Sequence, residues 1–276
     1  MSPSNTAAST ALEPVRPIRT PAPYIGGKRF LAPRLAAMID AIDHNLYAEP
    51  FVGMGGVFFK RTRQPKCEVI NDVSHDVVTL FRILARHYKP FVEMLEWHVG
   101  SRAEFERLMA VDPDTCTDLE RAARFLYLQK MAFGGKVAGR GYGTVYDAPS
   151  RFRLSEIEPT LRDLHDRLER VHIECLPYEK LIARFDRLGA LFYLDPPYWD
   201  CEGDYGAGVF GRDDFERLAD QLAGLKGRFI LSINDAPGVR DVFGRFAIEV
   251  VPTTYTIGTA HGGGQRVGEL VVTGGA

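Results

Sequence analysis

Apolar residues follow two alternating patterns along the chain. Short runs that are almost wholly apolar, such as CEVIN (67–71), ALFYL (190–194) and RFILSIN (228–234), are typical of buried strands. Between them lie segments with apolar residues every three or four positions, such as Leu31 and Leu35, which predict amphipathic helices. Because strand and helix patterns alternate, we expect an α/β fold with a doubly wound, mostly parallel sheet.

Two parts of the chain depart from this alternation. The last two β-rich runs, FAIEVVPTTYTIG and GELVVTG, have no helix between them and predict a C-terminal antiparallel hairpin. Residues 88–158 have no strand pattern and are mainly helical, then rich in glycine. We therefore predict a flexible tail over 1–22, one domain built from 23–87 and 159–276, and an inserted region over 88–158.

The charge of the chain is unevenly distributed. The formal net charge is only -2, which by itself does not indicate a polyanionic partner. Between Arg121 and Arg153, however, seven Lys or Arg residues face a single acid, Asp147. This excess indicates a nucleic-acid contact in the inserted region, for which Lys130, Lys136 and Arg140 are the first candidates. For any single one of them, a solvated surface charge is an equally good interpretation.

Cysteine usage and hydropathy exclude several classes of protein. The four cysteines are far apart in sequence and form no C-x-x-C pair, so we predict free thiols in a reducing compartment and no metal site. No run of about 18 apolar residues occurs, which excludes a membrane span on composition. We therefore expect a cytoplasmic protein.

A glycine-rich loop follows the strand pattern that ends at Glu49. Gly53 and Gly55 in EPFVGMGG allow backbone to approach a ligand closely, and Asp72 ends the next strand about 20 residues on, where a carboxylate can bind ribose hydroxyls. Because the glycines lack the G-x-G-x-x-G spacing, a mononucleoside ligand fits better than a dinucleotide. The alternatives are a plain tight turn and an Asp72 that only caps the next helix together with Ser74.

The run LFYLDPPYWD ends a buried strand in an unusual way. Pro196 and Pro197 have no N–H, so this segment offers carbonyl acceptors in a rigid geometry, and Asp195 adds an acceptor-only carboxylate. Tyr198 adds a flat aromatic face. Such a corner suits an NH2 group held by both its protons beneath a stacked ring. The alternative is a proline turn that closes the strand.

DPPY after an apolar strand, together with PFVGMGG and the early YIGGK, resembles the Dam-like N6-adenine-specific DNA methyltransferases. The order of the motifs is similar to the alpha group of amino-methyltransferases, in which the cofactor motifs precede the target-recognition region and the catalytic motif follows it. The resemblance covers Tyr24 to Thr273 and implies that the inserted region 88–158 is the DNA target-recognition region. It implies a Rossmann-like fold, S-adenosylmethionine as cofactor, no metal, and methyl transfer to the exocyclic amine of a flipped adenine in duplex DNA.

The resemblance also implies roles for single residues. The methionine end of the cofactor would be held by Tyr24, Gly26, Gly27 and Lys28. Its main cradle would be formed by Glu49, Pro50, Phe51, Gly53 and Gly55, and its ribose would be bound by Asp72. The implied catalytic residues are Asp195, Pro196, Pro197 and Tyr198.

One position departs from the family pattern. The acid that often precedes the helix before the DPPY strand is replaced by Pro177 in CLPYEKLI, with Glu174 and Glu179 nearby. This puts in doubt the contact to the adenine of the cofactor in that region.

The resemblance extends to partners and leaves alternatives open. It implies a monomer that acts on double-stranded DNA in a bacterial, phage or prophage context, with a cognate restriction endonuclease as the further partner to consider. The enzymatic alternatives are methylation of cytosine N4 or of RNA. A non-catalytic DNA-binding relative is the alternative from another class, and a nicotinamide-dependent oxidoreductase is disfavoured by the glycine spacing.

Overall fold

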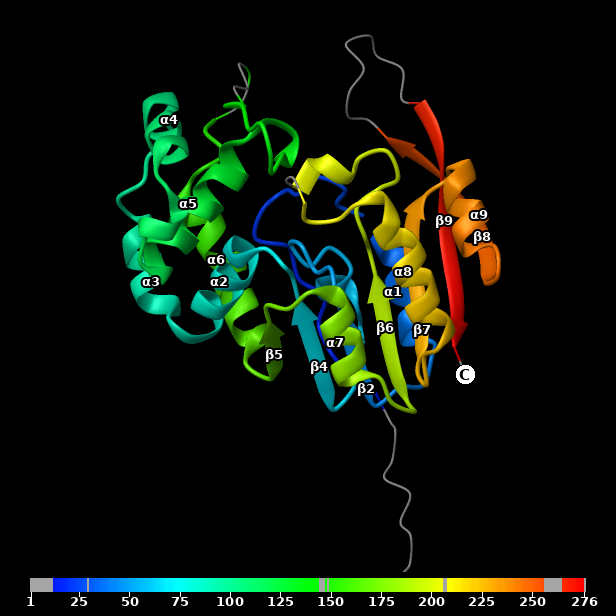
Figure 1. The fold of residues 1–276 in the computed structure, drawn as a ribbon. Coiled ribbons are helices and arrows are strands. Elements are labelled where there is room, and N and C mark those ends of the chain that lie inside the picture. The colour runs from blue at the N-terminus through cyan, green and yellow to red at the C-terminus, as the bar shows by residue number, and fades with distance from the viewer. Residues whose placement is uncertain are drawn as a thin grey trace, which may run out of the picture.

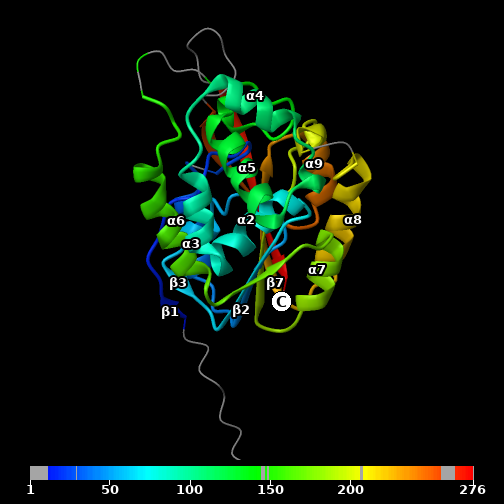
Figure 2. The same cartoon turned by 90° about the vertical axis from the view of Figure 1, so that its left-hand side faces the viewer.

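A twisted sheet runs through the middle of the protein, and helices cover both of its faces (Figures 1 and 2). The computed structural model describes residues 12–28, 30–143, 147, 149–205, 208–255 and 265–275. Within these residues, no helix is both long and apolar enough to cross a membrane.

The sheet has the strand order β5-β4-β2-β6-β7-β9-β8. Its strands are β2 (Leu46–Glu49), β4 (Cys67–Asn71), β5 (Val171–Glu174), β6 (Ala190–Leu194), β7 (Arg228–Asn234), β8 (Ala247–Tyr255) and β9 (Gln265–Gly275). Neighbours from β5 to β7 pair in parallel, whereas β9 is antiparallel to both β7 and β8. The predicted mostly parallel sheet with a C-terminal antiparallel hairpin is therefore confirmed.

Alternating side chains of the strands supply two hydrophobic cores, because successive residues of a strand point to opposite faces. In β6, Leu191 and Tyr193 belong to one core, whereas Phe192 and Leu194 belong to the other. The first core is covered by α1 (Ala32–Asp40) and α2 (His75–Arg86). The second is covered by α7 (Tyr178–Phe185), α8 (Arg212–Ala223) and α9 (Pro237–Phe243).

The inserted region packs on α2 beside the β5 edge of the sheet (left in Figure 1). Its helices are α3 (Tyr88–Leu95), α4 (Arg102–Ala110), α5 (Asp118–Met131) and α6 (Leu154–Leu168). Phe125 and Leu126 of α5 share one hydrophobic core with Phe81 of α2, so the insert and the domain are packed together. Because α6 begins at Leu154, a single helix spans the predicted boundary at residue 158.

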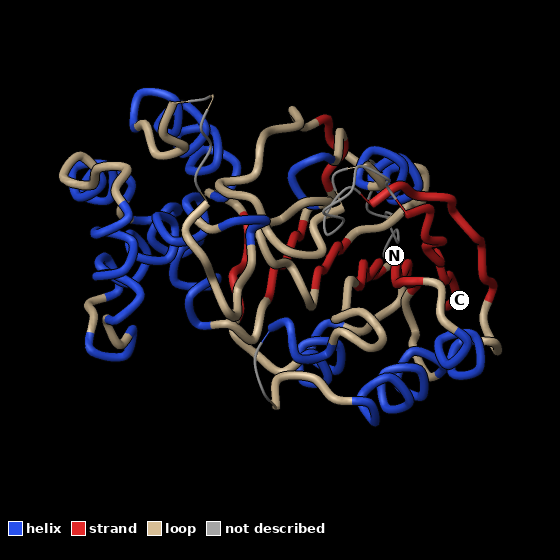
Figure 3. Tube along the Cα trace, turned by 90° about the horizontal axis from the view of Figure 1, so that it is seen from above, coloured by secondary structure: helices blue, strands red, loops and turns tan. Residues whose placement is uncertain are grey.

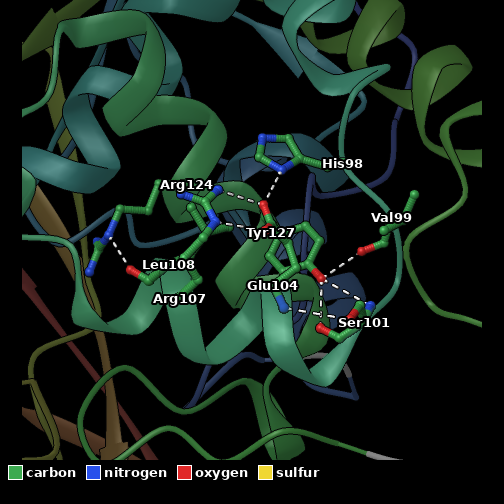
Figure 4. Close-up of polar contacts among 8 residues, drawn as sticks. All are labelled: His98, Val99, Ser101, Glu104, Arg107, Leu108, Arg124 and Tyr127. Atoms are coloured by element: carbon green, nitrogen blue, oxygen red, sulfur yellow. Dashed lines mark hydrogen bonds and ion pairs between the residues drawn. The ribbon is translucent and has the colours of Figure 1, made fainter.

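Polar contacts fix α4 against α5 within the insert (Figure 4). The hydroxyl of Tyr127 lies 2.8 Å from the carbonyl oxygen of Val99 and accepts from the backbone N–H of Ser101 at 3.2 Å. The Nε of Arg124 donates to the carbonyl of Leu108 at 2.8 Å. These bonds satisfy backbone groups near both ends of α4 and hold it against α5.

The N-terminal segment differs from the predicted flexible tail. Leu12, Ile18 and Ala22 are buried, and β1 (Glu13–Pro14) pairs antiparallel with β3 (Arg63–Gln64). Backbone bonds from Val15 and Ile18 to the 59–62 segment add to this pairing, so residues 12–22 lie along the domain. Residues 1–11 lie outside the described part of the chain.

Four short 3-10 helices complete the described elements: η1 (Phe58–Lys60), η2 (Pro113–Thr115), η3 (Phe133–Gly135) and η4 (Glu202–Tyr205). The first lies between β2 and β3, after the glycine loop.

Candidate active site

The carboxyl ends of the parallel strands meet at one edge of the sheet, at the top of Figure 1. Figure 3 looks down on this edge, where loops cross above the strand ends. Polar residues end or follow most of these strands: Glu49 ends β2, Asn71 ends β4 and is followed by Asp72, Asp195 follows β6, and Asn234 ends β7. Ligands of open α/β sheets bind at this edge, so we place the candidate site here.

The glycine loop after β2 needs glycine for steric reasons. Gly53 and Gly55 have φ values of 50° and 71°, in the left-handed region that favours glycine. A Cβ on Gly53 would lie 3.0 Å from the ring of Tyr24, and one on Gly55 would lie 2.4 Å from the ring of Phe59. The backbone of the loop therefore packs closely against two aromatic rings, Tyr24 at Gly53 and Phe59 at Gly55.

Asp72 fastens this loop to the end of β4. Its carboxylate accepts from the backbone N–H of Gly53 and of Ser74, each at 2.9 Å. Ser74 caps α2, since its hydroxyl accepts from Val77 N at 3.4 Å. Burial raises the pKa of Asp72 to about 6, although the backbone bonds lower it. Ribose binding by Asp72 stays a prediction.

The loop of Tyr24 to Lys28 turns back on itself beside the glycine loop. Gly26 has φ 69°, and Gly27 N donates to Tyr24 O at 3.0 Å. Ile25 N donates to Gly135 O in the insert at 2.9 Å. This loop therefore connects the insert with Lys28, whose side chain is only 2% exposed.

Lys28 brings the DPPY segment and the C-terminal hairpin together. Its ammonium lies 2.9 Å from Asp195 Oδ1, 2.7 Å from the hydroxyl of Tyr198, and against the carboxylate of Glu269 in β9. The Tyr198 hydroxyl in turn lies 3.1 Å from both carboxylate oxygens of Glu269. We call Lys28, Asp195, Tyr198 and Glu269 the carboxylate corner.

Asp195 and Tyr198 are both half-buried, and 23% of the Asp195 side chain is exposed. Burial raises its pKa to about 6, against the lowering effect of Lys28. Ser232 of β7 hydrogen-bonds Asp195, and the Ser232 hydroxyl is 2.7 Å from that of Tyr193. Pro196 and Pro197, which follow Asp195, are buried. The acid is thus held by Lys28 and Ser232 and can still face a ligand.

Glu49 lies deeper, at 1% exposure, and its Oε1 accepts from the hydroxyl of Tyr47 at 2.7 Å. Burial raises its pKa to about 8. Glu49 is therefore mostly protonated at neutral pH, and Asp195 is mostly ionised.

Two asparagines clamp the loops of the site, and sequence reasoning assigned neither of them a role. Asn71, which is 1% exposed, donates to the carbonyls of Pro50 and Leu176 and accepts from Leu176 N, at 2.8 to 2.9 Å. Asn234 accepts from Trp199 N at 2.9 Å and donates to Trp199 O at 3.2 Å. Both asparagines lie in the triplet IND at the end of a strand. The repeated triplet is the sequence signal that could have identified them.

Sequence reasoning also missed Glu269. Its signal was an acid inside the otherwise apolar run GELVV. Because β9 is antiparallel to β7, its early residues lie at the carboxyl edge, where Glu269 is paired in register with Asn234.

An aromatic group adjoins the glycine loop on the α7 side. The ring of Phe51 lies 5.4 Å from that of Tyr178 and 6.0 Å from that of Phe210. Pro177, at the position of the missing acid, is the N-cap residue of α7, and Glu174 pairs with Arg184 at 3.4 Å. These contacts give an apolar, aromatic surface on this side of the site.

The three basic candidates of the insert differ in exposure. Lys136 is exposed, whereas Lys130 and Arg140 are half-buried, and burial lowers the pKa of both. Arg140 also donates to Lys136 O and to the side-chain oxygen of Gln129, each at 3.1 Å. The Phe133 ring nearby is 61% exposed.

Metal-ligating side chains do not gather at this site. Across the described residues, no group of three or more His, Cys, Asp or Glu side chains is placed to hold a metal ion.

Known proteins share the sequence pattern of this chain. The pattern of the family described as D12 class N6 adenine-specific DNA methyltransferase matches residues 24–257. The chain is 25% identical over 268 residues to the type II methyltransferase M1.LlaDCHI of Lactococcus lactis subsp. cremoris, with 91% of this chain and 93% of that protein covered.

Two further relatives come from viruses. The type II methyltransferase M.CviBI of Paramecium bursaria Chlorella virus NC1A is 23% identical, with 91% of this chain and 95% of that protein covered. The DNA N-6-adenine-methyltransferase of Escherichia phage P1 is 29% identical over 74% of this chain and 28% of that protein.

Proposed function

The chain belongs to the D12 class of N6 adenine-specific DNA methyltransferases, and from this premise we propose that the carboxylate corner methylates adenine at a specific sequence in duplex DNA. The observation that carries the proposal is the meeting of Asp195 and Tyr198 with Lys28 beside the glycine loop. Type II methyltransferases among the relatives support sequence-specific action, with a cognate restriction endonuclease as a candidate partner.

The site fits S-adenosylmethionine, the cofactor of the family. A Cβ on Gly56 would meet only Lys28 N, at 3.8 Å, so the glycine loop and the Tyr24–Lys28 loop face each other across a space that a side chain would fill. We propose that Tyr24, Gly26, Gly27 and Lys28 hold the methionine end of the cofactor. The cradle would be Glu49, Pro50, Phe51, Gly53 and Gly55, with Asp72 at the ribose. When bound, S-adenosylmethionine supplies a methyl group on a positively charged sulfur.

The residues of the corner act on the target amine. Adenine N6 is a poor nucleophile because its lone pair is delocalised into the ring. Asp195 and the Pro196 carbonyl would accept hydrogen bonds from its two N–H groups, which favours a pyramidal nitrogen with its lone pair directed at the methyl group. The ionised Asp195 and the face of Tyr198 stabilise the positive charge that develops on the base. Since this corner cannot reach a stacked base, the adenine must be flipped out of the duplex.

Lys130, Lys136 and Arg140 would contact the DNA backbone. Lys136 is the sharpest test because it is exposed. Lys136→Ala should weaken duplex binding at every sequence and lower the slope of log K against log salt by about 1. Lys66→Ala, an exposed lysine before β4 at the opposite edge of the sheet, is the matched control and should leave the slope unchanged.

The proposal is tested by methyl transfer itself. The protein is incubated with labelled S-adenosylmethionine and duplex DNA, and the product is digested to nucleosides. We expect label in N6-methyladenine; label in N4-methylcytosine, in RNA alone, or in no base despite cofactor binding would contradict the proposal. Asp195→Ala should abolish transfer and leave cofactor affinity nearly intact, whereas equal loss of both would show that Asp195 is not catalytic.

A further inference from the structure

Glu269 is a buried acid at the active site that none of the motifs contains. Its side chain is 1% exposed, and its described contacts include the Lys28 ammonium and the Tyr198 hydroxyl. A buried carboxylate without partners would be costly, so these contacts account for its charge. Lys28 also contacts Asp195, at 2.9 Å.

The hydrogen-bond capacity of Lys28 explains what Glu269 does. An ammonium has three donors, and Lys28 directs them at Asp195, Tyr198 and Glu269. Lys28 therefore forms ion pairs with two carboxylates, Glu269 and Asp195, and not with Asp195 alone. The Tyr198 hydroxyl accepts from Lys28 and donates to Glu269, which fixes the far end of its ring.

From this geometry, and resting on the proposed function, we propose that Glu269 is a positioning residue for methyl transfer. It holds the Tyr198 ring in place and keeps Lys28 shared between two carboxylates, so that Asp195 remains available as an acceptor for the target amine. Two carboxylates and one ammonium also leave the corner with a net negative charge, which favours the positive charge that develops on the base.

The variant Glu269→Gln tests this role because it keeps the shape of the side chain and removes its charge. Lys28 would then pair with Asp195 as its single carboxylate partner in the corner. We expect kcat to fall by about 10- to 100-fold, the effect of one hydrogen bond to a charged group. The KM for DNA and the Kd of S-adenosylmethionine should stay within about two-fold of the wild type, since Glu269 acts on the amine side.

A pH profile separates positioning from a merely structural role. The described charged and polar groups around Asp195 fall into two sets. Lys28, Ser232, Glu269 and Tyr198 are the nearer ones, and Glu49 and Tyr193 lie further away. Among them, Glu269 raises the pKa of Asp195 by charge repulsion. Removing this charge should move the acid limb of kcat to lower pH. A structural defect would lower the melting temperature and kcat together and leave the limb in place.

Glu249→Gln is the matched control. Glu249 lies in β8 of the same hairpin, is 53% exposed, and pairs with Arg34 at 2.6 Å, outside the carboxylate corner. The same chemical change there should leave kcat and the acid limb unchanged. An equal loss in both variants would overturn the proposal.

Tyr198→Phe gives a second measurement, and its single effect can be measured even if Glu269→Gln is unstable. Tyr198→Phe removes only the hydroxyl that Glu269 holds, and alone it should lower kcat several-fold. The two changes together should cost less than the product of their single effects. Independent effects, or full activity of either variant, would overturn the proposal. If the wild type transfers no methyl group to adenine, the proposed function itself fails; an active wild type with unaffected variants refutes only the role of Glu269.

Discussion

The side-chain amide of Gln129 donates to the carbonyl of Pro23 at 2.9 Å, which ties helix α5 of the insert to the loop that carries Lys28. The same amide group donates to Gly135 O at 2.6 Å, and its oxygen accepts from Arg140 at 3.1 Å. Gln129 is completely buried. Two hydrogen bonds through Gln129 therefore connect Arg140, which we expect to contact DNA, with Pro23, which directly precedes the expected cofactor loop.

Replacing Gln129 should therefore affect both parts. Gln129→Leu leaves two backbone carbonyls without this donor, and we expect a loss of about 2 kcal/mol in unfolding free energy. We also expect weaker binding of S-adenosylmethionine, because the loop that carries Lys28 loses its hydrogen bond to α5. If this bond couples the two sites, added duplex DNA should raise the cofactor affinity of the variant by a smaller factor than that of the wild type. Denaturant unfolding and calorimetric titration measure these effects.

Gln221→Leu is the control for this variant. Gln221 donates to Glu179 O at 2.9 Å between α7 and α8, away from the Lys28 loop. It should lower stability without changing the affinity for the cofactor. A Gln129 variant that binds the cofactor as the wild type does, with the same response to DNA, would contradict the coupling.

The two strand-end asparagines should have separable effects. Asn71→Ala removes three hydrogen bonds that hold Pro50 and Leu176, so it should destabilise the fold by about 3 kcal/mol and weaken cofactor binding. Asn234→Ala releases the backbone of Trp199, directly after the DPPY segment, so it should lower kcat more than cofactor affinity. Each variant is the control for the other. The same pattern of losses in both would refute the separation.

Methyl transfer should fall in acid because Asp195 must be ionised to accept from the target amine. Burial raises its pKa to about 6, so kcat should decline as the pH falls through that value. The pKa of Asp72 is also raised to about 6 by burial, and its protonation should weaken cofactor binding over the same range. Measuring kcat and the cofactor Kd separately at each pH distinguishes the two acids.

Asp235→Asn is the control for this profile. Asp235 follows β7 at the same edge, but its carboxylate pairs with Arg240 at 2.7 and 2.8 Å. Its variant should keep the acid limb of the wild type. A wild-type kcat profile without an acid limb near pH 6, or a limb that disappears in Asp235→Asn, would contradict the assignment to Asp195.

Stability should depend on pH through Glu49. Burial raises its folded-state pKa from 4.5 to about 8, so the folded chain favours the protonated acid. The stability contribution is complete below pH 4.5 and is lost as the pH rises toward 8. Glu49→Gln resembles the protonated form, so its melting temperature should fall less between these pH values than that of the wild type.

Glu216→Gln on the exposed face of α8 gives the comparison for this experiment. It should keep the wild-type slope of melting temperature against pH. Parallel slopes for the wild type and Glu49→Gln would show that Glu49 is not the group that titrates.

By itself, the sequence determined those features of the protein that depend only on residues close together in the chain. Alternating strand and helix patterns predicted the parallel sheet, and the runs EPFVGMGG and LFYLDPPYWD indicated at which strand ends the candidate site should lie. A proline without an N–H or a glycine with positive φ acts through its own backbone, so a short motif contains its physical meaning. This is why the family could be predicted from the sequence.

The tertiary structure decided how distant residues complete the site. Lys28 and Glu269 are 241 positions apart, and their contact depends on β9 running antiparallel beside β7. Gln129 reaches Pro23 across 106 positions because α5 packs on the domain, and residues 12–22 lie along β3 because their apolar side chains find a surface there. Burial then set the protonation of Glu49 and Asp195, since desolvation depends on neighbours that no local pattern names.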